Sequence, residues 1–325
     1  MLKGQAANEA EALAVWKKGR SKRLWTHIWA HRGFYLMFLP VAVLVLILYY
    51  WPMLGIRYSF FDYKPVGDPV FVGFKHFQKM FSTKAFWTSF GNTLFLSIMK
   101  LLLTTATSVI ISVFLNEMKN IYAKKTLQTL IYLPHFMSWA VVASIFSLIL
   151  SPSATGMING ILKDLNIIDP NGAGIYFLAD KAWWRPIFFL INIWKETGWG
   201  TVIFLATLSG INPELYEAAD IDGANRLQKI WYVTVPALSQ TIIIVLILNL
   251  AKVMNMFESV FVLYNSAVYD VSDVISTYIY RQTFTIALPN YGYTTAVGLF
   301  KSLVGGGLVI LCNWISKQIR GRGIL

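Results

Sequence analysis

Six ionisable side chains fall inside long apolar stretches of this sequence, where they could bind a polar solute. They are four lysines and two glutamates: Lys100, Lys195, Glu196, Lys252, Glu258 and Lys301. A charged group in a bilayer is costly unless it faces a polar cavity or pairs with an opposite charge. The six residues therefore either line a pathway, pair between helices, or lie nearer the lipid headgroups than the apolar stretches indicate.

Four polar residues recur at intervals of three, from Asn249 through Lys252 and Asn255 to Glu258. In a helix this spacing places them along one slowly drifting face. A wet polar stripe of this kind would suit sugar hydroxyl groups, and four lysines against two glutamates are compatible with an acidic sugar such as a uronate oligomer. We predict a substrate pathway formed by Lys100, Lys195, Glu196, Asn249, Lys252, Asn255, Glu258 and Lys301.

A second polar group forms the stretch from Tyr216 to Leu238, which reads YEAADIDGANRLQKIWYVTVPAL. Alanine and glutamate favour a helix, whereas a glycine inside a helix costs about 1 kcal/mol. We therefore expect two short helices with a bend at Gly223. Such an elbow could seat in a groove of a soluble partner, and an ordinary helical loop is the alternative that the residues alone leave open.

The chain has none of the motifs that would indicate catalysis or nucleotide binding. It has no His-Glu-x-x-His, no Gly-x-Ser-x-Gly and no Gly-x-x-x-x-Gly-Lys-Ser/Thr. His27 and His31 have the spacing of a metal site, but no third ligand candidate is near, so polar tips at a membrane interface are the favoured interpretation. We expect no catalytic residue, no metal and no cofactor bound by this chain.

The composition requires an integral membrane protein. Of the 325 residues, 56% are hydrophobic and only 14% are charged, which is too apolar for a soluble globule. The net charge of +12 could indicate nucleic acid. The basic residues, however, cluster at the ends of apolar stretches, where they meet anionic headgroups, so we expect lipid and no nucleic acid as a partner. Cys312 is a single cysteine, so no intrachain disulfide can form.

Long apolar stretches predict an all-α protein with six transmembrane helices. The predicted spans are 34–56, 92–116, 127–150, 186–208, 236–262 and 293–315, with a short amphipathic helix at 157–168. Residues 1–33 form a separate basic and aromatic segment, in which residues 15–31 predict a helix lying on the membrane surface. The first apolar stretch is too long for a cleavable signal peptide, and it lacks a cleavage site. Three consecutive glycines, 305–307, predict a close helix crossing or a flexible point.

The distribution of basic residues predicts that both termini are cytoplasmic. With the C-terminal tail taken as inside, the inner segments hold fifteen lysines and arginines and the outer loops hold nine. The stretch from Tyr216 to Leu238 then faces the cytoplasm.

The spacing within this stretch resembles a known motif. Glu217-Ala218-Ala219, three residues, Gly223, nine residues, Val233, one residue and Val235-Pro236 are similar to the EAA loop of bacterial ABC importer permeases, which usually ends in Ile-x-Leu-Pro. The two valines depart from that ending but keep its apolar character. Further similarities point to the carbohydrate branch, to permeases for oligosaccharides and polysaccharide fragments such as the alginate importer. They are Leu215-Tyr216, Asp222-Gly223-Ala224-Asn225, Gly156-Met157-Ile158-Asn159 and Gly198-Trp199-Gly200.

The resemblance covers residues 34–325 and implies a maltose-permease-like fold with six spans in the bacterial inner membrane. It implies four kinds of partner: a second, homologous permease in a heterodimer, two ATPase subunits that bind ATP and Mg, a periplasmic or extracellular solute-binding protein, and an oligosaccharide substrate. In the loop 212–235, Glu217 would pair with a basic ATPase residue and Gly223 would give the bend. The coupling residues implied are Glu217, Ala218, Ala219, Asp222, Gly223, Ala224, Arg226 and Pro236, the last of which would begin the next span.

Three other functions remain open at this stage. An EAA loop does not name the cargo, so a permease for another solute class, such as an amino acid or phosphate, is the main alternative. A proton-driven secondary transporter would move its solute without an ATPase. An intramembrane enzyme would need the catalytic motifs and paired acids that this sequence lacks.

Overall fold

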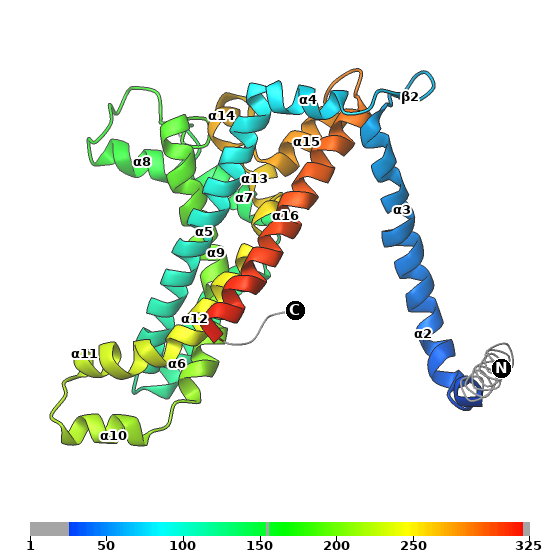
Figure 1. Cartoon of the computed structure of the whole chain (residues 1–325). Coiled ribbons are helices and arrows are strands. Elements are labelled where there is room, and N and C mark those ends of the chain that lie inside the picture. Colours follow the sequence, from blue (N-terminus) through cyan, green and yellow to red (C-terminus); the bar gives the residue numbers. More distant parts are fainter. Residues whose placement is uncertain (1–25, 154–155, 321–325) are drawn as a thin grey trace, which may run out of the picture. The chain divides into compact units, whose positions relative to one another are not determined.

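The computed structural model describes residues 26–153 and 156–320, and it divides the chain into two units, residues 1–57 and 58–325 (Figure 1). The described part is almost entirely helical. Its strands are one short antiparallel ribbon, in which β1 (Phe61–Asp62) pairs with β2 (Val70–Phe71). The predicted all-α class is confirmed, with this ribbon as a small addition in the first predicted outer loop.

The first unit contains the first predicted span. A continuous helix runs from Arg32 to Phe60 as α2 (Arg32–Val45), the π-helical turn η1 (Leu46–Tyr50), α3 (Trp51–Met53) and the 3-10 helix η2 (Leu54–Phe60), whose last residues belong to the second unit. None of its most apolar stretch is buried. The predicted surface helix at 15–31 lies mostly outside the described residues. His31 and His27 stack with ring centroids 4.3 Å apart, and the described chain has no group of three residues that could hold a metal.

The second unit holds the remaining elements. They are α4 (Lys75–Ser82), α5 (Lys84–Asn116), α6 (Ile121–Tyr132), η3 (Leu133–Phe136), α7 (Trp139–Ile149), α8 (Met157–Asp164), α9 (Lys181–Ser209), α10 (Glu214–Ile221), α11 (Arg226–Lys229), η4 (Ile230–Thr234), α12 (Val235–Leu250), η5 (Val253–Asn255), α13 (Glu258–Phe261), η6 (Ser266–Val268), α14 (Tyr269–Ser272), α15 (Ile275–Phe284) and α16 (Tyr291–Arg320). In Figure 1, α4, α14 and α15 lie at one end of this unit, and α10 and α11 lie at the other.

Within the described residues, four helices are long and apolar enough to cross a membrane, and a bent helix pair would make a fifth span. The four are Arg32–Phe60, Lys84–Asn116, Arg226–Leu250 and Tyr291–Gln318. Helix α9 covers the predicted span 186–208 and has 29 residues, but it is less apolar because it carries Lys195 and Glu196 near its middle. The count of six spans stays a prediction.

The predicted span at 127–150 is not one continuous helix, because the chain bends sharply inside it. The helix that ends at Phe136 and α7 meet at 102°. Pro134 cannot donate a backbone hydrogen bond. Met137 and Ser138 are extended, and the Ser138 hydroxyl starts α7 by accepting from the backbone N–H of Val141 at 3.3 Å.

The predicted span at 236–262 is also wrong in its second half. Helix α12 ends at Leu250, and a 3-10 turn and an extended Met256 separate it from α13. The Ser97 hydroxyl of α5 donates to the Val253 carbonyl at 2.8 Å, which satisfies a backbone group that the break leaves free. The proposed stripe through Lys252, Asn255 and Glu258 therefore does not exist as one helical face.

Helices α5 and α9 form the centre of the second unit. Asn92 of α5 bonds Arg185 of α9 at 2.9 Å, and the Ser108 hydroxyl donates to the Thr197 carbonyl at 3.0 Å. From the first contact to the second, the residue numbers increase along both α5 and α9, so the two helices run parallel. A Cβ atom on Gly198 would lie 2.2 Å from the Ile131 carbonyl oxygen, so α9 packs directly on the backbone of α6.

The triple glycine at 305–307 does not mark a close crossing within the described chain. Helix α16 runs through it without a break. A Cβ on Gly305 would only touch Met254 at 3.9 Å, and the other two glycines have open space.

A buried asparagine organises the loop around α8. The Asn159 side chain donates to the carbonyls of Ser151 and Ile175 and accepts from the Ile175 N–H at 2.8 Å. A Cβ on Gly156 would lie 1.8 Å from the Ser151 carbonyl oxygen. The Gly-Met-Ile-Asn sequence thus closes this loop, and α8 begins at the predicted residue but ends four residues earlier, at Asp164.

The Asp62 carboxylate, which is ion-paired within the β1–β2 ribbon, ties the ribbon to the residue before α16 and gives a pH prediction. The Asp62 carboxylate accepts from Lys64 at 2.9 Å and also from Asn290. The hydrogen bond from Lys64 lowers the pKa of Asp62, and partial burial opposes it. Because the folded-state pKa lies below the unfolded one, the pair stabilises the fold above about pH 4, and this stabilisation is lost as the pH falls through the folded-state pKa.

We expect Asp62→Asn to lower the stability at pH 6 by less than about 1 kcal/mol, since the pair is partly exposed. The difference from the wild type should shrink towards pH 3. Thermal unfolding in detergent at several pH values measures it, with Asp68→Asn, an exposed residue of the same turn, as the matched control. A difference that is constant with pH would contradict the role of this carboxylate.

Candidate functional site

Two lysines lie at similar depths in the two central helices, within about one helical turn of each other. Lys100 is 16 residues from the start of the 33-residue α5, and Lys195 is 14 residues from the start of the 29-residue α9. At 1.5 Å per residue these positions are about 24 and 21 Å from the helix starts. Because the helices run parallel, both lysines belong to the middle of the unit.

The bend at Pro134 supplies the partner of Lys195. The Lys195 side chain is only 4% exposed, and its Nζ donates to the backbone carbonyl of His135 at 2.9 Å. A helix break leaves carbonyl groups without their usual backbone donors. The buried ammonium group therefore stabilises the bend, and the bend solvates the charge.

Glu196 is paired with histidine and not with a lysine. Its carboxylate lies 3.4 Å from Nδ1 of His135. The imidazole also stacks on Trp199, with ring centroids 5.1 Å apart, and meets the Phe136 ring edge-to-face at 5.8 Å. Glu196, His135 and Trp199 thus form one group of contacting side chains beside Lys195.

Trp139, the first residue of α7, lies between the two lysines. The Nζ atoms of Lys195 and Lys100 are 5.3 and 5.8 Å from the centroid of its indole ring, within the range of cation–π attraction. Lys100 is half-buried. Among the described residues its ammonium group makes no hydrogen bond or ion pair, and its contact here is the Trp139 ring. We call Lys100, His135, Trp139, Lys195, Glu196 and Trp199 the midspan cluster.

The structure brings together three of the eight residues predicted for the pathway. Lys100, Lys195 and Glu196 belong to the midspan cluster. Lys301 lies elsewhere, where its Nζ donates to the Ser276 hydroxyl at 3.0 Å. The remaining four, Asn249, Lys252, Asn255 and Glu258, are exposed in and beside the break after α12, where Asn249 bonds only the Val245 carbonyl of its own helix among the described residues.

Sequence reasoning missed three members of the cluster, His135, Trp139 and Trp199. One signal was present: Pro134 with the adjacent His135 inside an apolar stretch predicts a helix break with a polar residue at it. The two tryptophans carry no such signal, because tryptophan in a membrane helix most often anchors the interface.

Replacing the buried lysine tests whether it holds the bend. We expect Lys195→Met, which keeps the side-chain volume but removes the donor, to lower stability by about 1–3 kcal/mol, because the His135 carbonyl loses its partner. Thermal unfolding of the detergent-solubilised protein measures the effect. Lys301→Met is the comparison, since that half-buried lysine bonds a hydroxyl that can rotate to another partner. Equal stability of Lys195→Met and the wild type would contradict the role.

The predicted elbow is confirmed at the other end of the unit. Helices α10 and α11 are joined at Gly223, whose φ of +76° is the left-handed conformation that glycine adopts at least cost. The Ala224 N–H donates to the Ala219 carbonyl at 2.9 Å, which closes α10. Asn225 then starts α11 through a reciprocal capping box with Gln228.

Side-chain contacts hold the elbow in one shape. Lys229 pairs with Asp220 at 2.6 Å, and the Tyr216 hydroxyl bonds the Thr234 hydroxyl at 3.0 Å. Two apolar side chains nevertheless face outwards, since Ile221 is 87% exposed and Leu227 is 68% exposed. Apolar residues on a polar elbow are typical of a surface that another protein covers.

The predicted coupling residues lie on this outer surface. Glu217, Ala218, Asp222, Gly223 and Arg226 are exposed, and Ala219 and Ala224 are half-buried. Pro236, which was predicted to begin the next span, is the second residue of α12. The apolar helix nevertheless starts earlier, because α11 and the π-helical turn η4 continue into α12 from Arg226 to Leu250.

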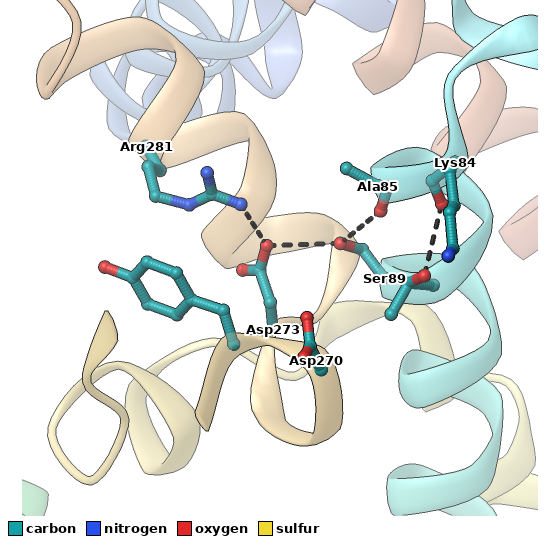
Figure 2. Close-up of a pocket in the computed structure, with 8 residues that line it drawn as sticks. Lys84, Ala85, Ser89, Asp270, Asp273 and Arg281 are labelled. Atoms are coloured by element: carbon teal, nitrogen blue, oxygen red, sulfur yellow. Dashed lines mark hydrogen bonds and ion pairs between the residues drawn. The ribbon is translucent and has the colours of Figure 1, made fainter. Parts of the chain in front are cut away.

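The opposite end of the unit contains a pocket of about 350 Å³ (Figure 2). Asp273 is buried in its wall and accepts from the Thr277 hydroxyl at 2.7 Å, the Ser89 hydroxyl at 3.2 Å and Arg281. These contacts join α5 to α15. The charged groups of Asp273 and Arg281 thus bond to each other, and their contacts stabilise this end of the fold.

Comparison with known proteins identifies the family. A family model described as "Binding-protein-dependent transport system inner membrane component" matches residues 108–321, which include α9 and the elbow. The chain belongs to this family. The permease is therefore a transport protein of the inner membrane, and both of these predictions are confirmed.

Individual relatives cover the whole permease. It is 37% identical over 328 residues to the polygalacturonan/rhamnogalacturonan transport system permease protein YteP of Bacillus subtilis, with 100% of both chains covered. It is 36% identical to a chain of a bacterial ABC transporter that imports the acidic polysaccharide alginate, with a TM-score of 0.82 over 92% of this chain and 99% of that one. The alginate transporter bound to an alginate pentasaccharide-loaded periplasmic protein matches equally, at 36% identity and a TM-score of 0.82 over 93% and 100% of the chains.

Proposed function

We propose that this permease is one of two homologous membrane subunits of an ATP-driven importer for acidic oligosaccharides. The observation that carries the proposal is the similarity, over at least 92% of the chain, to proteins of transporters whose named cargoes are polygalacturonan/rhamnogalacturonan and the acidic polysaccharide alginate, all of which contain uronic acids. The surplus of positive charge in the midspan cluster, two lysines against one glutamate, agrees with a negatively charged cargo.

The elbow is the site at which ATP-driven motion would enter the permease. The chain has no nucleotide-binding motif, so the energy has to come from a partner. Two ATPase subunits would each hold one permease elbow, with Glu217 and Arg226 offering charges and Ile221 offering an apolar contact. Closure of the ATPases on ATP would draw the two elbows together.

Helix α9 connects this motion to the cargo site. The elbow follows α9 after Ser209, and Lys195 lies 14 residues back along the same helix, about 21 Å away. A tilt of α9 would therefore displace Lys195 and Glu196 against the bend at His135. The cavity between the permeases would then alternate its opening between the two sides of the membrane.

Reconstitution tests the proposal. The permease, its partner permease, the two ATPases and the binding protein are placed in liposomes, and uptake of labelled trigalacturonate is measured with and without ATP. We expect uptake only when ATP and loaded binding protein are both present. Neutral trisaccharides of the same length should compete poorly.

Other outcomes of the uptake experiment would indicate other functions. Uptake by the permease alone, driven by a proton gradient, would indicate a secondary transporter. Neutral oligosaccharides that outcompete trigalacturonate would leave the importer intact and remove the acidic cargo. An amino acid or phosphate as the only transported solute would indicate another solute class.

A further inference from the structure

We propose that Lys100 binds a carboxylate of the cargo in the middle of the membrane, and this assignment rests on the proposed function. Lys100 has the depth that such a site needs, since it lies halfway along α5 beside the midpoint of α9. Transport sites between alternating openings lie near this depth.

The contrast between the two lysines carries the assignment. The Lys195 ammonium is buried and bonded to the His135 carbonyl, so it has a structural partner. Lys100 is half-buried, and among the described residues its ammonium group makes no hydrogen bond and no ion pair. A cation at this depth is tolerated where it meets water or an anion.

The nearby glutamate makes no ion pair within 4 Å of Lys100 in the described part of the chain. The Glu196 carboxylate contacts His135 instead, at 3.4 Å. With two ammonium groups around the Trp139 ring and one carboxylate turned to the histidine, the midspan cluster keeps an excess positive charge. A carboxylate of the cargo would balance this excess positive charge.

The surrounding aromatic groups fit a sugar as the rest of the ligand. Trp199 and Phe136 flank His135 and are 53% and 77% exposed, so broad apolar faces remain open next to the cluster. Ligand sites typically combine aromatic walls with a few placed polar groups. A uronate offers both an apolar ring face and one carboxylate, and a neutral hexose lacks the carboxylate.

The test compares two cargoes that differ only in charge. Uptake and ATPase rates of the reconstituted complex are measured with trigalacturonate and with its carboxyl-reduced, neutral counterpart. Lys100→Met should lower the trigalacturonate rate about tenfold to a hundredfold, the range for loss of a charge-assisted bond, and change the neutral rate far less. Lys100→Arg, which keeps the charge, should retain most of the trigalacturonate rate.

Two further measurements keep the outcomes distinct. Lys163→Met removes a lysine of α8 that bonds the Gly172 carbonyl and belongs neither to the midspan cluster nor to the predicted pathway, and its ratio of acidic to neutral transport should stay that of the wild type. Thermal unfolding and co-purification with the partner subunits report whether Lys100→Met is folded. An equal loss for both cargoes, or no loss, overturns the assignment of Lys100 while wild-type uptake of trigalacturonate supports the proposed function. A wild-type complex that moves neither cargo overturns both.

Discussion

Gly198→Ala is expected to prevent the permease from reaching its native packing. The added Cβ would lie 2.2 Å from the Ile131 carbonyl oxygen and 2.9 Å from the carbonyl carbon. These are backbone atoms, so no side chain can rotate away to make room. Overpacking of a core costs about 1–3 kcal/mol and occasionally more, and this contact belongs at the upper end.

Two measurements check the expectation. Fluorescence size-exclusion chromatography gives the yield of monodisperse protein, and the apparent melting temperature gives its stability. Gly298→Ala is the matched control, because it makes the same change in a long helix at a position with nothing within 4 Å. Wild-type yield and melting temperature for Gly198→Ala would show that α9 does not pack on α6 in this way.

Gly223→Val is expected to separate ATP hydrolysis from transport while leaving the membrane part folded. A Cβ at this position would meet nothing within 4 Å, so the effect is one of backbone conformation alone. The φ of +76° costs an L-residue about 1–2 kcal/mol, and more when the side chain is β-branched. Since 1.4 kcal/mol is a factor of ten, we expect transport to fall at least about tenfold.

Gly223→Asn provides the control for this change. Asparagine also adds a side chain, but unlike valine it adopts the left-handed conformation readily. We therefore expect Gly223→Asn to keep most of the transport activity. Binding-protein-stimulated ATPase activity and co-purification of the ATPases with the permease are the readouts. Equal losses for Val and Asn would mean that side-chain volume, and not the bend, matters at the elbow.

Apolar length and local turn chemistry were sufficient to predict much of this fold. The helices around 34–56, 92–116 and 293–315 were expected from their apolar length, and the bend at Gly223 was expected from a glycine between alanine-rich turns. These features depend on residues near one another in the chain. The EAA spacing correctly indicated the family for the same reason.

Apolar length did not predict the two helix breaks, although Pro134 was a local signal for the first. The bend near Pro134 depends on a donor from Lys195, and the break after Leu250 depends on Ser97, far away in the sequence. Both stretches are apolar enough to be taken for straight spans. The midspan cluster is assembled by the first break, and its aromatic members were therefore not predicted. The roles of its residues and of the elbow residues remain predictions.

The bend at His135 also sets a condition on how the protein is made. Lys195, the side chain that bonds the bent backbone, lies 60 residues downstream of His135. While the ribosome is still completing the intervening loop and α8, the carbonyl at the bend has no such donor. The carbonyl at the bend can therefore receive this hydrogen bond only after α9 has been synthesised and inserted beside the stretch from Ile121 to Ile149.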